Sequence, residues 1–154
     1  DKVWVPNSGG SAEFIRFIGD EVEPFIAKTY LTNGSRTLIG QSLGGLLGTE
    51  ILFTRPELFD NYILVSPSLW WDDGSLSTTA DNWCKEHADT RKSVYIAMAS
   101  DDDMMQDDID RVRTALKAHA HEPLRWAYVE FPEETHATIL HQAVYRAFQW
   151  MGGK

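Results

Sequence analysis

A single serine lies between two glycines in the stretch TLIGQSLGGLLGTE, residues 37–50. Gly40, Ser42 and Gly44 match the pattern G-x-S-x-G, which is typical of a nucleophile elbow. In such an elbow a sharp turn between a strand and a helix exposes the serine hydroxyl for attack on an ester carbonyl. The Leu43 N–H would then point to the place where the substrate oxyanion forms. A glycine-rich packing turn with a capping serine is the alternative interpretation.

A serine nucleophile of this kind needs a base, and the base needs a carboxylate that orients it. Asp102 is the first choice for the carboxylate, because it follows the third apolar, strand-like segment closely. Its neighbours Asp101 and Asp103 could take its place. Asp72 or Asp73, after the second such segment, could also supply the acid, since a triad requires geometry and no fixed sequence position.

His136 is the candidate base. It lies in a loop between the fourth strand-like segment and the last helix, where a side chain can reach the serine. The other histidines are expected on helix surfaces, at helix ends or inside the last helix: His87, His119, His121 and His141. The chain order Ser42, Asp102, His136 is the order of the triad in α/β-hydrolases.

The elements that would position these residues alternate between helix and strand, which predicts an α/β domain with a mainly parallel sheet flanked by helices. Four strands are expected, at residues 37–40, 62–65, 94–99 and 124–131. Helices are expected over 43–54 and 79–88, and along apolar stripes at 105–116 and 140–151. A further helix is expected before the first strand, where Ser11 could cap it and Pro24 interrupts it. The candidate residues all follow strand ends, where sites form in such sheets.

Composition limits the classes of function. The 154 residues fit one domain, and 43% of them are hydrophobic, as in globular proteins. The formal charge of −9 disfavours nucleic acid as a partner, and no apolar run is long enough to span a membrane. One cysteine, Cys84, excludes an internal disulfide and a cysteine metal cluster. A cytoplasmic or a periplasmic, bacterial-type location fits equally well.

The stretch RTLIGQSLGGLLGTEILFTRPELFDNYILVSPSLWWDD, residues 36–73, resembles the putative esterase family of α/β-hydrolases. This family includes esterase D, feruloyl esterases, mycolyltransferases and siderophore esterases, and the resemblance is greatest to the siderophore-esterase branch. The segments FIGDEVEPFIAKTY and ETHATIL also fit the pattern. The resemblance implies that Ser42 is the nucleophile and His136 the base, that Gln41, Trp70 and Trp71 contact the substrate, and that no metal or cofactor is needed.

The resemblance also implies that the chain corresponds to the C-terminal portion of the family's catalytic domain, without its N-terminal strands. The loop that supplies a second oxyanion N–H lies in the missing part. The expected function is therefore a serine esterase acting on a small-molecule ester. The alternatives are a catalytically silent fragment that self-associates through an unpaired sheet edge, and an acyltransferase that passes the acyl group to an alcohol.

Overall fold

The computed structural model describes residues 7–100 and 106–153. Its elements are α1 (Ser11–Phe17), the π-helix η1 (Ile18–Val22), α2 (Glu23–Thr29), β1 (Thr37–Gln41), α3 (Leu43–Thr54), the 3-10 helix η2 (Pro56–Leu58), β2 (Asn61–Val65), α4 (Trp71–Gly74), the 3-10 helix η3 (Ser77–Thr79), α5 (Ala80–Glu86), β3 (Ser93–Ala99), α6 (Gln106–His119), β4 (Arg125–Phe131) and α7 (Ile139–Gly152). The expected order of helices and strands is confirmed.

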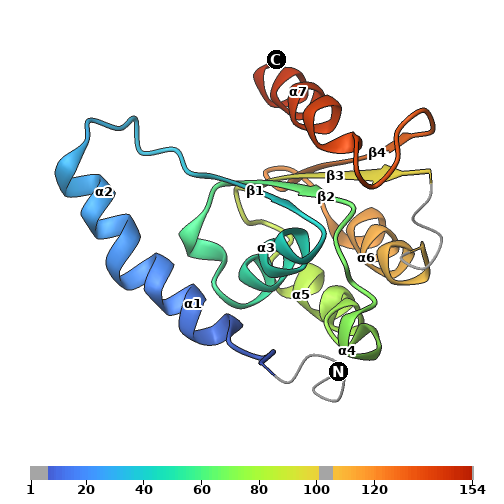
Figure 1. Ribbon diagram of the computed structural model, residues 1–154, viewed down its shortest axis with the longest axis horizontal. Coiled ribbons are helices and arrows are strands. Elements are labelled where there is room, and N and C mark those ends of the chain that lie inside the picture. The colour runs from blue at the N-terminus through green and yellow to red at the C-terminus, as the bar shows by residue number, and fades with distance from the viewer. Residues whose placement is uncertain (1–6, 101–105, 154) are drawn as a thin grey trace.

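The four strands form one parallel sheet in the order β1-β2-β3-β4 (Figure 1). Gln41, the last residue of β1, pairs with Val65, and Val65 in turn pairs with Ala97. The carboxyl ends of all four strands therefore lie along the same edge of the sheet. Ser42 and the loop that carries His136 follow strand ends at this edge.

Helices cover both faces of the sheet, α7 on one and α3, α5 and α6 on the other (Figure 1). Because side chains alternate along a strand, the two central strands supply both cores. Ile63 and Val65 of β2 pack with Ala143 of α7, while Tyr62 and Leu64 of β2 pack in the larger core with α3, α5 and α6. Both faces of β2 and β3 are thus buried, which explains their nearly unbroken apolar sequences.

The segment before β1 is a nearly continuous helical rod that runs along the β1 side of the molecule (Figure 1). Pro24 lies in the first turn of α2, directly after the π-helix, so the expected interruption is present. The expected capping role of Ser11 is wrong: Gly10 is the N-cap of α1, and the Ser11 hydroxyl donates instead to Glu50 of α3 at 2.9 Å. Ser11 thus ties the rod to α3.

Most of the large apolar side chains exposed in the described part belong to the segment before β1 and to β1 itself. They are Phe14, Phe17, Phe25, Ile26, Tyr30, Leu31 and Ile39. Ile39 shares a sheet face with Ile63 but is 45% exposed, whereas Ile63 is fully buried. No helix in residues 7–100 and 106–153 is both long enough and apolar enough to cross a bilayer.

Candidate active site

Ser42 forms the corner between β1 and α3, as the sequence predicts. Its backbone has φ 58° and ψ −122°, a conformation that L-residues rarely adopt and that costs about 1–3 kcal/mol. The backbone around it is held on both sides. The Ser42 N–H donates to Val65 O at 3.0 Å, and the Ser42 carbonyl accepts from Leu46 N at 2.9 Å and Ser68 N at 3.1 Å. These bonds stabilise the strained turn.

The glycines around the serine contribute unequally. A Cβ on Gly40 would lie 2.2 Å from Gly44 O, and one on Gly45 would lie 2.9 Å from the Pro67 Cα. A Cβ on Gly44 would meet nothing within 4 Å. Gly40 and Gly45 are therefore the positions where the close approach of β1, α3 and the loop after β2 requires glycine.

A second serine contacts the candidate nucleophile. The Ser68 hydroxyl lies 3.2 Å from the Ser42 hydroxyl, and Ser68 is 2% exposed. Ser68 belongs to the loop after β2, which begins with Ser66 at a positive φ of 39°. The Ser66 hydroxyl accepts from the Ala99 N–H at 3.2 Å, which joins this loop to the end of β3. In the sequence, Ser66 and Ser68 flank Pro67 directly after a strand. This spacing was the signal from which Ser68 could have been identified.

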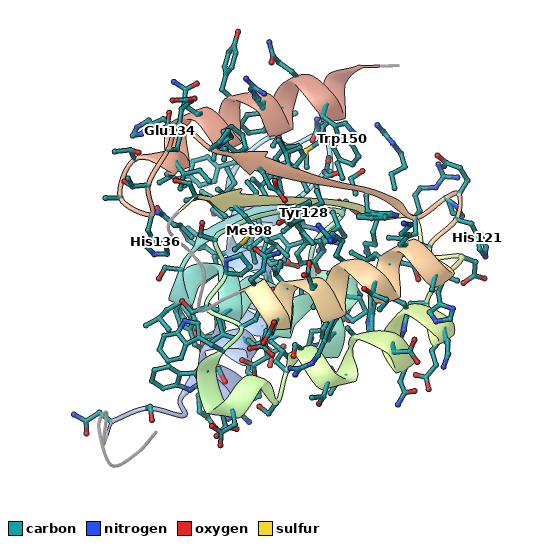
Figure 2. All side chains as sticks on the ribbon, turned by 90° about the vertical axis from the view of Figure 1, so that its right-hand side faces the viewer. Met98, His121, Tyr128, Glu134, His136 and Trp150 are labelled. Carbon is teal, nitrogen blue, oxygen red and sulfur yellow. The ribbon has the colours of Figure 1, made fainter. Side chains whose placement is uncertain are left out.

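His136 lies on the loop between β4 and α7. Figure 2 shows it with Glu134 at one end of the sheet, while His121 lies at the opposite end. The side-chain amide of Gln41 donates a hydrogen bond to the backbone carbonyl of His136, across 95 positions of sequence. Because Gln41 precedes Ser42 directly, the structure brings the histidine loop to the serine corner.

Trp70 and Trp71 follow Ser68, and their rings lie 5.8 Å apart. Trp71 lines a cavity of about 680 Å³ together with Leu43, the residue after the candidate nucleophile. The Trp70 indole nitrogen is buried and has no hydrogen-bond partner in the described part of the chain. Trp71 therefore lies beside the serine corner with Trp70 next to it, and a substrate contact of the two rings stays a prediction.

The turn after the tryptophans is strained and clamped. Asp72, Asp73 and Gly74 all have positive φ, between 53° and 69°. A Cβ on Gly74 would lie 2.2 Å from a carboxylate oxygen of Asp108, which accepts a hydrogen bond from Ser77 at 2.7 Å. Asp108, which is 8% exposed, thus fixes this turn against α6.

Asp101, Asp102 and Asp103 lie outside the described residues, so the first choice for the acid stays a prediction. The alternative acids Asp72 and Asp73 are exposed at the strained turn, where Ser75 donates to Asp72 at 3.1 Å. Within residues 7–100 and 106–153, no group of three or more His, Cys, Asp or Glu side chains could hold a metal ion.

The other histidines have contacts away from the serine corner. His87 stacks on Trp83 with a centroid distance of 4.9 Å, and His119 contacts Asp81 at 2.8 Å. His121 and His141 are exposed.

Ser100 was not predicted from the sequence to have a role. It follows β3 and holds the loop that carries His136, because its hydroxyl donates to Glu134 O at 3.0 Å.

Residues 2–149 match the family described as "Putative esterase". The chain belongs to this family. Its fold is the α/β-hydrolase type that the sequence predicts, here with four parallel strands flanked by helices. The match includes the serine corner and the histidine loop.

Relatives that match this part of the chain are esterases of siderophores. The chain is 28% identical over 152 residues to the ferri-bacillibactin esterase BesA of Bacillus subtilis, covering 94% of this chain and 53% of the relative. It is 43% identical over 75 residues to a siderophore enterobactin esterase of Emericella nidulans, covering 47% and 25%. An IroE-like serine hydrolase from Shewanella oneidensis superimposes with a TM-score of 0.81 at 28% identity, covering 92% and 48%. The chain thus spans about half the length of BesA and of the IroE-like hydrolase.

Proposed function

We propose that this chain carries the catalytic serine and histidine of a carboxylic-ester hydrolase. The observation that carries the proposal is the turn at Ser42. Its strained backbone joins a parallel strand to a helix at the carboxyl edge of the sheet, and four hydrogen bonds or close contacts hold it there. A strained serine with φ of 58° is stable only if the surroundings maintain it, and such residues cluster at active sites.

The proposed reaction proceeds through an acyl-enzyme. The Ser42 hydroxyl attacks the ester carbonyl while the His136 imidazole takes its proton. His136 then gives this proton to the leaving alcohol oxygen as the C–O bond breaks. Water attacks the acyl group on Ser42, and His136 again takes and returns a proton, releasing the carboxylic acid and the free serine. The aspartate that orients His136 is Asp102 in this proposal.

The oxyanion of the tetrahedral intermediate is placed at the N-terminus of α3. The N–H groups in the first turn of a helix have no partner within the helix, and the helix dipole favours negative charge there. Leu43 is the first residue of α3, so its N–H is the proposed donor. Removal of one oxyanion donor typically lowers kcat about 10²- to 10³-fold, so turnover depends strongly on whether a second donor is present.

The substrate class follows from the relatives and from the side chains near the serine. One relative is named as a ferri-bacillibactin esterase and another as a siderophore enterobactin esterase, which makes siderophore esters the first substrates to test. Trp71 and Leu43 supply an apolar wall in the cavity beside the serine corner. Feruloyl, thioester and short acyl substrates are the comparison set, because an aromatic wall also accepts their acyl groups.

The proposal is tested by ester hydrolysis in stopped flow with an activated ester such as p-nitrophenyl acetate. We expect a burst of nitrophenol from the chain, and no burst from Ser42→Ala or His136→Ala. Ser35→Ala, a change at an exposed serine before β1, is the matched control and should leave the burst unchanged. A burst that survives Ser42→Ala would contradict the proposal. Product analysis with added alcohol separates hydrolysis from acyl transfer.

A second candidate function is self-association of a catalytically silent chain through the edge at β1. The observation that favours it is the exposed apolar surface of the rod and β1, where Ile39 is 45% exposed and Phe25 60% exposed. An edge strand with such neighbours is a template for pairing with another chain.

Size-exclusion chromatography with light scattering, run beside the ester assay, separates the two candidates. A dimer or larger assembly without a burst favours the silent function, and a monomer with a burst excludes it. Ile39→Lys should dissociate an assembly formed through β1, because a charged side chain would then replace an exposed apolar one at the sheet edge.

A further inference from the structure

The loop that carries His136 has a set of local hydrogen bonds. The Glu134 N–H donates to Phe131 O at 3.0 Å, and the Thr138 and Ile139 N–H groups both donate to Thr135 O at 3.0 Å. These bonds shape the loop but do not place it relative to Ser42. Bonds from other strand ends contribute to the position of the loop relative to the serine.

Three such bonds come from the ends of two other strands. From β3, the Ser100 N–H and hydroxyl both bond to Glu134 O, at 3.1 and 3.0 Å. From β1, the Gln41 side-chain amide donates to His136 O. The bonds from Ser100 hold the start of the loop, and the bond from Gln41 holds the histidine residue itself.

Gln41 is chemically suited to this bond. Its side-chain nitrogen is a neutral donor, and a backbone carbonyl is an acceptor only. Gln41 is part-buried and ends β1, so its backbone is fixed by pairing with Val65 of β2. The next residue is Ser42. The bond therefore sets the backbone of His136 relative to the residue that precedes the nucleophile.

We infer that Gln41 is a positioning residue that holds His136 in register with Ser42, and that it acts through this bond and not by contacting the substrate. The inference rests on the proposed function of Ser42 and His136. It replaces the substrate-contacting role that the family resemblance implies for Gln41 with a role in the geometry of the base.

The expected effect is large because proton transfer depends steeply on distance. A displacement of about 1 Å in a catalytic constellation can cost about 10²-fold in rate. Loss of the Gln41 bond frees the carbonyl of His136 but leaves the β3 bonds to Glu134 in place, so the displacement should be smaller. A 10- to 100-fold loss of serine reactivity is therefore expected, without a change in affinity for the reagent.

The test compares Gln41→Met and Gln41→Glu with the unmodified chain in the reaction of Ser42 with a fluorophosphonate. Methionine keeps the length of the side chain and removes the donor, and glutamate places a negative acceptor against the carbonyl. Gln142→Met, the same change at an exposed position of α7, is the matched control. We expect the maximal rate of inactivation to fall 10- to 100-fold in both Gln41 variants, with an unchanged half-saturating concentration and unchanged melting temperature.

A raised half-saturating concentration with an unchanged maximal rate would overturn the inference, because that is the signature of a lost substrate contact. Unchanged kinetics would overturn it as well. If Gln41→Met does not fold, Gln41→Asn, whose amide is one methylene group shorter, serves in its place with the same expected result.

Hydrogen exchange of the amides at 134–139 provides a readout that does not depend on activity. Faster exchange in Gln41→Met than in Gln142→Met supports the inference, and equal exchange overturns it. If the unmodified chain shows no reaction at Ser42, the proposed function fails, and the exchange measurement alone decides whether Gln41 holds the loop.

Discussion

Replacement of Gly40 by alanine should break the serine corner, whereas the same change at Gly44 should not. A Cβ on Gly40 would lie 2.2 Å from Gly44 O and 2.9 Å from Gly45 N, both backbone atoms of the first turn of α3. Ordinary contact needs about 3.4 Å or more, so strand and helix would have to separate by more than 1 Å. Overpacking of this kind costs about 1–3 kcal/mol, and rigid backbone atoms favour the upper end.

For a chain of this size, a loss of about 3 kcal/mol lowers the melting temperature by about 6–12 °C. Gly44→Ala should raise it by up to about 4 °C, because alanine favours helix by as much as about 1 kcal/mol and its Cβ meets open space. Thermal unfolding by circular dichroism measures both changes, and fluorophosphonate labelling should slow about 10²-fold in Gly40→Ala alone. Equal melting temperatures and equal labelling rates would refute this account of the corner.

Three further predictions concern the contact of Ser68 with Ser42, the buried Asp108 of α6 and the buried Cys84 of α5. Ser68→Ala removes a buried hydroxyl that lies 3.2 Å from the Ser42 hydroxyl. It should therefore change the rate of Ser42 labelling, measured by stopped flow, and leave the melting temperature, measured by circular dichroism, nearly constant. Asp108→Ala should lower the free energy of unfolding by about 1–3 kcal/mol in urea, because it removes a buried acceptor. Burial raises the pKa of the Cys84 thiol to about 11, so stability should fall as the pH rises from about 9 to 11, and this fall should be smaller in Cys84→Ala.

The sequence predicts the strand and helix order well because the apolar pattern is strong. The central strands are buried on both faces, so their apolar runs stand out, and the glycine–serine motif between strand and helix locates the corner at Ser42. The position of His136 at the same edge follows from parallel strands alone. These predictions depend on local pattern and on one topological rule.

Contacts between distant segments could not be predicted in the same way. The bond from Gln41 to His136 and the contact between Ser42 and Ser68 depend on how loops fold over strand ends. The motif also treats Gly40 and Gly44 as equivalent, and only the packing of α3 separates them. The prediction that Ser11 caps a helix was wrong for a similar reason. Its hydroxyl donates a hydrogen bond to Glu50 of α3, which lies 39 positions away in the sequence.

Covalent labelling most directly tests whether Ser42 is a nucleophile served by His136. The chain is treated with a fluorophosphonate, digested, and mapped by mass spectrometry beside His136→Ala and the Ser35→Ala control. We expect one modified residue, Ser42, in the chain and in the control, and a labelling rate at least 10²-fold lower in His136→Ala. Modification at another residue, or equal labelling of Ser42 without the histidine, would contradict the hydrolase mechanism.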